Sequence, residues 1–517
     1  MTASAAPRTR VSGPLARSGA ELAALITGAA LRDGAVKAEL LVDGLRAIRG
    51  ARVDSRLVAD GEIFFALPGE RTDGRLHMVD ALERGAAAVV AERPNSAAAP
   101  HAVAPHAGEG AALDVAMAAA KVAATKHGAT LLLVDSGVRA LAAAATSWRA
   151  RFDLDVIGVT GSVGKTTTKE LIAAALGGAA TKTSATPGNA NNEIGLPLAL
   201  LNLPDGAERL VAEMGMYVGG DIADLCAMAR PRVGVVTAID AVHASRAGDL
   251  DAIAAAKGEL IAALPADGCA VLNADDARVL TLAARGPAPV ISAGSATGAT
   301  VRIERVELDQ ATAHTLVTVA TEEGSVTANL PLFGLHFASG AALAIATAGT
   351  CGVPAAIAAE RLSNVALPSG RATVRSVGGV RLIDDAYNAA PSSMRAALAT
   401  LAASPARRFA ALGAMGELGD YAAAAHLEIG RVAASSDLEF LIVLGDEADG
   451  IAEGARLGGM PIERIIRLST DEAGIDAAAG LLRDRVSAGD SILIKASRAS
   501  ELERLVAAIA ARLEAGA

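Results

Sequence analysis

The chain has 517 residues, of which 52% are hydrophobic and 20% charged, and its formal net charge is −10. This length exceeds what one hydrophobic core supports and predicts about three to four domains. The apolar content excludes a disordered chain. The absence of a long basic run argues against nucleic acid as a partner, because such a surface needs clustered Lys and Arg.

The cysteines and the apolar runs indicate the cellular compartment of the protein. Cys226, Cys269 and Cys351 lie far apart in the sequence, which argues against a zinc knuckle or a disulfide framework and fits a reducing environment. No uncharged apolar run approaches the ~20 residues that span a bilayer, and the N-terminus lacks a signal-peptide pattern. We therefore expect a cytoplasmic protein without a membrane span, and we expect it to be a monomer.

The first region, residues 1–150, alternates short apolar runs with turns. Residues 1–17 are typical of a loose arm, and residues 93–116, rich in Ala, Pro, Gly and His, predict a surface loop. Three apolar runs predict buried strands: Glu62–Leu67, Ala86–Glu92 and Thr130–Ser136.

The second region, residues 151–366, alternates strand and helix patterns, which predicts a mostly parallel α/β sheet. Residues 299–330, richer in Thr and Val, favour an antiparallel appendage. The third region, residues 367–517, again has apolar strands that each lead into a loop or helix. The chain is therefore predicted to have three α/β domains, the central one a phosphate-loop domain with a parallel sheet and the last one Rossmann-like.

The string VIGVTGSVGKTTTKE, Val156–Glu170, is the sharpest signal in the central region. A buried strand runs into a glycine-rich turn and then into an apolar helix, so backbone N–H groups can surround a phosphate. Lys165 can reach the β- and γ-phosphates, and Thr166 can place its hydroxyl on Mg²⁺. A tight strand–helix turn with an exposed lysine is the alternative. The predicted nucleotide-binding residues are Gly161, Ser162, Gly164, Lys165, Thr166 and Thr167.

Glu213 ends the apolar run LVAE in the same region. The carboxyl ends of strands line the ligand crevice of an α/β sheet, and a carboxylate there suits Mg²⁺. A surface glutamate at a strand end is the alternative.

The form of the phosphate loop carries a family resemblance. Val159 stands where the generic G-x-x-x-x-G-K-[ST] loop has its first glycine, which leaves the shorter form Gly161–Thr166. This resembles the Mur ligase and folylpolyglutamate synthetase superfamily. The following TTTKE string resembles the branch that joins D-alanyl-D-alanine to UDP-N-acetylmuramoyl-tripeptide.

The resemblance implies an ATP- and Mg²⁺-dependent ligase of peptidoglycan precursor synthesis. Its three domains, 1–150, 151–366 and 367–517, would bind the UDP-sugar, ATP and the amine substrate in turn. ATP would phosphorylate the terminal carboxylate of UDP-MurNAc-tripeptide, and the amine of D-Ala-D-Ala would attack the acyl phosphate.

The resemblance also implies roles for residues of the central region. His243, and a carbamylated Lys257, would join Thr166 and Glu213 as Mg²⁺ ligands and act in catalysis. Asn273 and Asp276 would contact adenine. The loop ATPGNANNEIGLP would bind substrate through Thr186, Asn189, Asn191 and Asn192.

Outside the central region, Ser55 and Arg56 match the family's uridine-nucleotide contacts. Arg371 can clamp a γ-phosphate with its forked guanidinium, or be an exposed surface arginine. Three residues at a strand end in the third region are predicted to bind ligand, Asp385 and Tyr387 the nucleotide and Asn388 the substrate. A second strand end carries Ser497 and Arg498, a pair that suits a carboxylate such as that of the dipeptide.

Several positions depart from the family pattern: Ala238, Ser245, Phe337, Gly340, Ala390 and Ala414. Two alternatives therefore stay open. One is an amide ligase of the same superfamily that takes a different amine. The other is a nucleotide-binding homologue that has lost ligation.

Overall fold

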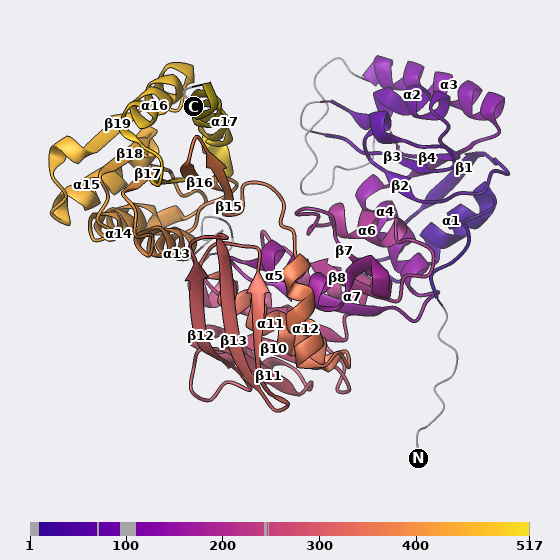
Figure 1. Cartoon of the computed structure of the whole chain (residues 1–517). Coiled ribbons are helices and arrows are strands. Elements are labelled where there is room, and N and C mark those ends of the chain that lie inside the picture. Colours follow the sequence, from indigo (N-terminus) through magenta and orange to yellow (C-terminus); the bar gives the residue numbers. More distant parts are fainter. Residues whose placement is uncertain (1–9, 70–71, 94–109, 242–245, 247, 516–517) are drawn as a thin grey trace. The chain divides into compact units, whose positions relative to one another are not determined.

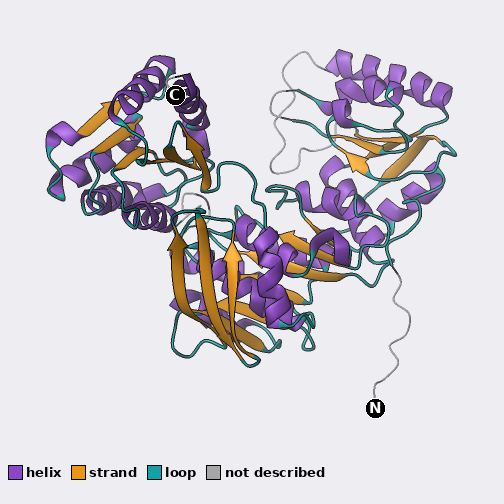
Figure 2. Ribbon diagram, in the orientation of Figure 1, coloured by secondary structure: helices purple, strands orange, loops and turns teal. Residues whose placement is uncertain are grey.

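The computed structural model describes residues 10–69, 72–93, 110–241, 246 and 248–515. They contain three sheets of five, nine and six strands with helices packed on them (Figure 1, Figure 2). By internal contacts the chain divides into two compact units. The first comprises Met1–Gly158, Ala179–Gly215 and Asp221–Arg232, and the second comprises Val159–Gly178, Met216–Gly220 and Val233–Ala517. None of the described helices is long and apolar enough to cross a membrane.

The five-stranded sheet lies in the first unit and has the order β1-β5-β4-β3-β2. Its strands are β1 (Ala38–Val42), β2 (Ala51–Arg52), β3 (Ile63–Ala66), β4 (Ala88–Glu92) and β5 (Thr130–Val134). Only β1 runs antiparallel to its neighbour among the strand pairs described in this sheet. The helices are α1 (Gly19–Thr27), α2 (Met78–Glu83), α3 (Gly110–His127) and α4 (Gly137–Arg149). In this unit α1 packs on α4 and α2 on α3 (Figure 1).

Two expectations for this region are wrong in part. Val11, Leu15 and Ala16 are buried, and Ala16 pairs with Ile48, so the segment from residue 11 onward is packed rather than a loose arm. The predicted surface loop also ends earlier than expected, because α3 begins at Gly110. Residues 1–9 and 94–109 lie outside the described residues.

The nine-stranded sheet has the order β14-β13-β12-β11-β10-β9-β6-β8-β7. Its strands are β6 (Asp155–Thr160), β7 (Thr183–Ala185), β8 (Arg209–Glu213), β9 (Val233–Val236), β10 (Cys269–Asn273), β11 (Val290–Gly294), β12 (Val301–Asp309), β13 (His314–Thr321) and β14 (Gly324–Leu330). The pairs β9–β10 and β10–β11 are parallel, whereas β12, β13 and β14 form an antiparallel meander. The parallel core and the antiparallel appendage are both confirmed.

Helices of this region follow the strands that the sequence predicts. They are α5 (Lys165–Ala175), α6 (Gly195–Leu201), α7 (Asp221–Ala229), α9 (Leu250–Ala262), α10 (Ala277–Thr281), α11 (Phe337–Thr350) and α12 (Ala355–Arg361). The sequence of α11 is almost entirely Ala, Gly and small polar residues. Small side chains let two helix backbones approach closely, and α11 packs on α5, the helix that follows the phosphate loop.

The six-stranded sheet has the order β15-β16-β20-β17-β18-β19. Its strands are β15 (Thr373–Val377), β16 (Val380–Asp385), β17 (Arg408–Gly413), β18 (Phe440–Leu444), β19 (Ile465–Leu468) and β20 (Ser491–Lys495). All described pairs are parallel except the hairpin β15–β16. The helices are α13 (Pro391–Ala402), α14 (Ala422–Ala434), α15 (Asp449–Leu457), α16 (Glu472–Arg485) and α17 (Glu503–Ala515).

Two apolar clusters flank this last sheet. One contains Met394, Ile429 and Ile451 from α13, α14 and α15, and the other contains Leu482 and Leu505 from α16 and α17. The sheet is therefore covered by helices on both faces, as predicted for a Rossmann-like domain (Figure 1). The carboxyl ends of β16, β17 and β20 meet at one edge because these strands are parallel neighbours.

Candidate functional site

The phosphate loop joins β6 to α5 in a backbone conformation that needs glycine. Gly161 has φ +148° and Gly164 has φ +80°, both in the region that side chains disfavour. A Cβ at Gly161 would lie 1.9 Å from Thr237 Oγ1, so the segment after β9 runs directly against the loop. Helix α5 then begins at Lys165 without a side-chain cap at Gly164. An uncapped helix N-terminus directed at a loop of this kind suits an anion.

The segment 237–240, just after β9, braces this loop with four hydrogen bonds. Thr237 Oγ1 donates to the Val163 carbonyl at 2.6 Å, and the Ser162 amide donates to the Ala238 carbonyl at 2.8 Å. The Ser162 hydroxyl donates to the Asp240 carbonyl and accepts from the Asp240 amide, each at 2.9 Å. The loop is therefore held in its phosphate-binding form by the neighbouring strand end.

Lys165 lies back over the loop that precedes it. Its Nζ donates to the Gly161 carbonyl at 2.8 Å and to the Ser162 carbonyl at 3.3 Å. Thr166 is almost fully buried beside it, and Thr167 is half-buried. The cationic head of Lys165 thus stands at the loop whose backbone would surround a phosphate.

Lys257 projects from α9 and is 1% exposed. Burial, followed by the nearby charge of Lys165, holds the pKa of Lys257 well below its ordinary value. A lysine in this state is a neutral amine over a much wider pH range. The neutral amine is the form that carbamylation requires, so the surroundings of Lys257 fit the predicted modification.

The structure gives Asn273 and Asp276 a bracing role that the sequence did not indicate. Asn273 Nδ2 donates to the Thr237 carbonyl at 2.7 Å. Asp276 Oδ2 accepts from the Ile239 amide at 2.8 Å, while its other oxygen caps α10. Both side chains hold the segment 237–240 against the phosphate loop.

In the first unit, the predicted substrate loop is built around Glu213. The carboxylate of Glu213 is 1% exposed and accepts from Asn191 Nδ2 at 2.8 Å, and its amide donates to Thr186 Oγ1 at 3.0 Å. Asn192 Oδ1 accepts from the amide of Gly195, the first residue of α6, at 2.9 Å, while Asn189 is exposed. A buried carboxylate at a strand end is a suitable ligand for a cation.

The predicted Mg²⁺ ligands do not form a cluster that the structure displays. Glu213 belongs to the first unit, and Thr166 and Lys257 to the second. His243 lies outside the described residues. Across the described part of the chain, no group of three or more His, Cys, Asp or Glu side chains is arranged to hold a metal ion.

In the third region, Asp385 joins three chain segments at the edge of the sheet. Its Oδ2 accepts from Lys495 Nζ at 2.6 Å, and its Oδ1 accepts from the Ala372 amide at 3.1 Å. Lys495 also donates to the Asn388 carbonyl at 2.9 Å. Lys495 is not among the predicted site residues, although its place at the end of β20, two residues before Ser497, was a usable signal.

Two arginines contact the ring of Tyr387 near the carboxyl edge of the six-stranded sheet. The guanidinium carbon of Arg371 lies 4.3 Å from the centre of the Tyr387 ring, and that of Arg498 lies 5.8 Å from it. Ser497 is buried and its amide donates to the Ala414 carbonyl at 2.9 Å. Two guanidinium groups on one aromatic ring form a subsite suited to phosphate or carboxylate.

Ser55 and Arg56 lie in a short turn of the first unit. Arg56 is exposed and pairs with Asp54 at 2.6 Å, which lowers the pKa of Asp54 to about 2. Ser55 is buried and its hydroxyl bonds to Asp80. Of the two predicted contacts, only Arg56 presents its polar group to solvent.

Comparison with known families decides the class of protein. Residues 47–149 match the Mur ligase family catalytic domain, residues 159–348 the Mur ligase middle domain, and residues 370–498 the Mur ligase glutamate ligase domain. A relative from Mycobacterium tuberculosis strain H37Rv, named UDP-N-acetylmuramoyl-tripeptide–D-alanyl-D-alanine ligase, is 36% identical over 475 residues, which cover 89% of this chain and 91% of that protein. The chain belongs to the Mur ligase family.

Further relatives and solved structures agree. The ligase of the same name from Bacillus subtilis is 32% identical, covering 89% of this chain and 92% of that protein. A crystal structure of MurF from Acinetobacter baumannii superposes with a TM-score of 0.77 and 25% identity, covering 95% of this chain and 98% of that one. MurF from Thermotoga maritima, solved with ADP, gives a TM-score of 0.74 and 29% identity over 91% and 99%. The predicted three-domain α/β fold and the ATP-dependent ligase class are confirmed.

Four departures from the Mur ligase pattern have a packing explanation. A Cβ at Gly340 would lie 2.8 Å from Leu171 Cδ1, so glycine there permits the close approach of α11 to α5. Phe337 and Ala414 are buried in apolar surroundings, and Ala390 is buried at the start of α13. At these four positions this chain has small or apolar residues that are buried, and one of them, Gly340, lies close to α5. Ser245 lies outside the described residues.

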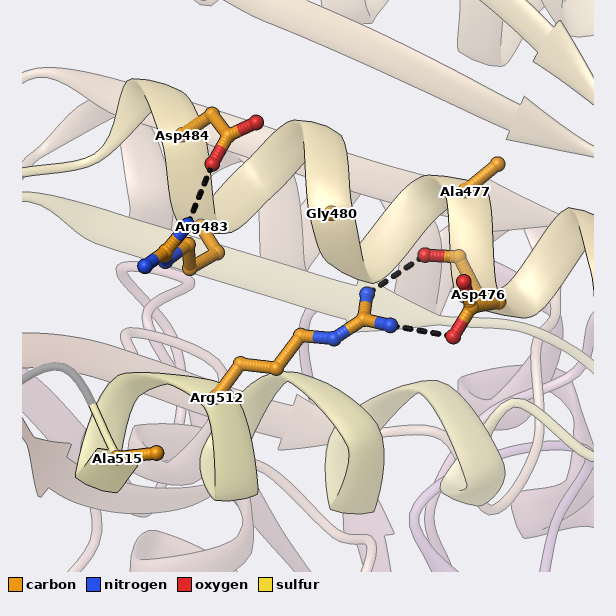
Figure 3. A pocket seen from close by; sticks show the side chains of 7 residues that line it. All are labelled: Asp476, Ala477, Gly480, Arg483, Asp484, Arg512 and Ala515. Atoms are coloured by element: carbon orange, nitrogen blue, oxygen red, sulfur yellow. Dashed lines mark hydrogen bonds and ion pairs between the residues drawn. The ribbon is translucent and has the colours of Figure 1, made fainter.

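A separate groove lies between α16 and α17 of this Mur ligase, with a volume of about 410 Å³ (Figure 3). Its charged groups pair with one another: Arg512 donates to Asp476, and Arg483 pairs with Asp484 at 3.1 Å. Gly480 of α16 also lines the groove. None of the predicted site residues lines this groove, so we assign the chemistry to the strand edges instead.

Proposed function

We propose that the chain joins D-alanyl-D-alanine to UDP-MurNAc-tripeptide in the cytoplasm, at the expense of ATP, during synthesis of peptidoglycan precursors. The observation that carries this proposal is the 36% identity, over nine-tenths of the length of both chains, to relatives bearing the name of that activity. The braced phosphate loop supports it, because an acyl-phosphate route needs a site that holds and neutralises the transferring phosphoryl group.

In this proposal the loop from Gly161 to Thr167 binds the phosphates of ATP. Lys165 reaches the transferring phosphoryl group, where its charge stabilises the transition state. Arg371 adds a second cation, and its guanidinium is already stacked on Tyr387. Asn273 and Asp276 contact adenine in this proposal. They also hold the segment 237–240 against the phosphate loop.

Mg²⁺ would be held by Thr166, Glu213, His243 and carbamylated Lys257. A bound Mg²⁺ would supply neutralisation of phosphate charge at this site. The burial of the Glu213 carboxylate, its contact with Asn191 and the lowered pKa of Lys257 fit such ligands.

The remaining residues divide between the two other substrates. We assign the UDP-sugar to domain 1–150 through Ser55 and Arg56, and the peptide to Thr186, Asn189, Asn191 and Asn192. We assign D-Ala-D-Ala to domain 367–517, with Asn388, Ser497 and Arg498 as contacts and Asp385 as the residue that orders their loops. We assign ATP to domain 151–366.

A coupled phosphate-release assay tests the proposal. Phosphate release is expected only when Mg-ATP, UDP-MurNAc-tripeptide and D-Ala-D-Ala are all present, because the acyl phosphate forms on one substrate and is consumed by the other. Phosphate release that does not depend on D-Ala-D-Ala but does depend on another amine would overturn the assignment of the amine substrate.

A further inference from the structure

Asp240 contacts the phosphate loop through its backbone. It follows β9, and its amide and carbonyl both bond to the Ser162 hydroxyl at 2.9 Å. The Ser162 side chain is buried, so this paired contact is shielded from solvent. Movement of the phosphate loop at Ser162 is therefore transmitted directly to the backbone of Asp240.

The side chain of Asp240 contacts a helix of the third region. Its Oδ2 accepts from the amide of Ser392, 152 residues further along the chain, at 3.2 Å. Ser392 is the second residue of α13, and both groups lie in the same compact unit. The other carboxylate oxygen accepts locally from the Ala241 amide at 2.8 Å.

Helix α13 lacks the usual local acceptor for its first amides. The residue before it is Ala390, whose side chain has no oxygen, and Pro391 has no N–H. Ser393 Oγ accepts from the Ala390 amide at 3.0 Å, which leaves the Ser392 amide to an acceptor from elsewhere. A carboxylate at this end of a helix is favoured both as a hydrogen-bond acceptor and as a negative charge near the helix dipole.

We infer that Asp240 is a positioning residue. It couples nucleotide binding at the phosphate loop to the position of the N-terminus of α13. The loop that enters α13 carries Tyr387 and Asn388, so the seating of this helix sets the position of the predicted ligand contacts. The link runs from Ser162 through Asp240 to Ser392, with no other side chain between. Its effect on ligation rests on the proposed function, whereas the coupling of loop to helix does not.

Hydrogen–deuterium exchange of the full chain, with and without Mg-ADP, tests the coupling. Mg-ADP should slow exchange in the peptide covering residues 386–398 of the unaltered protein. In Asp240→Ala, exchange at the first turn of α13 should be about 3- to 30-fold faster, the range expected for loss of a helix cap. It should also no longer respond to Mg-ADP, although calorimetry still shows binding of the nucleotide.

Asp471→Ala is the matched control. Asp471 caps α16 by accepting from the Gly474 amide at 2.9 Å, so this variant also removes a carboxylate from a helix N-terminus, but one with a local partner. It should leave residues 386–398 unchanged. Asp240→Asn, which keeps the shape and a weaker acceptor, should give an intermediate result and serves if the alanine variant does not fold.

Two results would overturn the coupling. One is exchange at residues 386–398 that responds to Mg-ADP equally in Asp240→Ala and in the unaltered protein. The other is loss of Mg-ADP binding in Asp240→Asn, which would confine the residue to bracing the phosphate loop. In ligation assays the coupling predicts a kcat lowered several-fold with an unchanged KM for ATP. Failure of the proposed function would instead appear as absent product in the unaltered protein, and the exchange result would stand.

Discussion

Asp385 and Lys495 face each other as register partners at the ends of the parallel strands β16 and β20, and their side chains form an ion pair of 2.6 Å. Lys495 is 3% exposed and Asp385 is 14% exposed. The pair fixes the carboxyl edge of the third sheet, from which Tyr387, Asn388 and Arg498 project.

Lys495→Met should therefore destabilise the protein strongly. Loss of Lys495 leaves the largely buried Asp385 carboxylate without its cation, and breaking a buried pair in this way costs about 3–5 kcal/mol, with the remaining bond from the Ala372 amide favouring the lower end. Denaturant unfolding followed in the third domain would measure the loss. The double variant with Asp385→Asn should recover most of the stability, because no buried charge remains. Equal stability of the single variant and the unaltered protein would show that the pair is not desolvated in solution.

Gly161→Ala should weaken nucleotide binding. The added Cβ would lie 1.9 Å from Thr237 Oγ1, and φ of +148° is unfavourable for alanine. Overpacking of this kind costs about 1–3 kcal/mol, so titration with Mg-ADP should show roughly 10- to 100-fold weaker binding. Gly349→Ala is the matched control, since a Cβ at Gly349 in α11 meets nothing within 4 Å. Unchanged affinity in Gly161→Ala would mean that the loop is not held against Thr237.

Lys257→Met should make the protein more stable while removing its activity. Burial lowers the pKa of Lys257 well below 10.5, so between the folded pKa and that value the unfolded state binds more protons than the folded state. The unaltered protein should consequently gain stability as pH rises through this window. The stability of Lys257→Met should not rise with pH in this way. Its free energy of unfolding should therefore exceed that of the unaltered protein most at low pH, and the difference should shrink as pH approaches 10.5.

Urea unfolding of both proteins at several pH values, in buffer free of carbon dioxide, would measure this difference. Parallel curves of stability against pH would contradict an unpaired amine at Lys257. Addition of bicarbonate with Mg-ADP should then protect the unaltered protein alone, because only the lysine can be carbamylated.

Lys165→Ala should abolish ligation and leave the fold intact. The Lys165 ammonium donates to the Gly161 and Ser162 carbonyl groups of its own loop, and the side chain is not part of the apolar core. Loss of the cation should also raise the pKa of Lys257 toward its ordinary value, since the Lys165 charge is one cause of the depression. Circular dichroism would show whether the variant is folded, and a phosphate-release assay would show whether it has lost ligation. Turnover retained by a folded Lys165→Ala protein would refute the assignment.

Local patterns in the sequence predicted most of the fold. The phosphate loop, the parallel strands and the antiparallel appendage all follow from glycine positions and from the spacing of apolar residues, which act over short distances along the chain. The start of α3 at Gly110 was missed because residues 93–116 were treated as one segment rich in Pro and Gly as well as Ala, although the alanine-rich part from Gly110 onward favours a helix.

The site was less predictable because its contacts are distant in sequence. The carboxylate of Asp385, a predicted nucleotide contact, bonds to Lys495, 110 residues away, and to the Ala372 amide. Strand register decides that pairing, and register is not visible in either segment alone. The bracing of the phosphate loop by Thr237 and Asp240 was missed for the same reason.

The most direct test of the central claim is a mass measurement of the product. The protein would be incubated with Mg-ATP, D-Ala-D-Ala and each UDP-MurNAc-tripeptide in turn, with Lys165→Ala as the inactive control. The account predicts a product whose mass equals that of the two substrates joined with loss of one water, formed by the unaltered protein alone. Absence of this product with every tripeptide, in a protein that still binds Mg-ATP, would contradict the account and favour a homologue that has lost ligation.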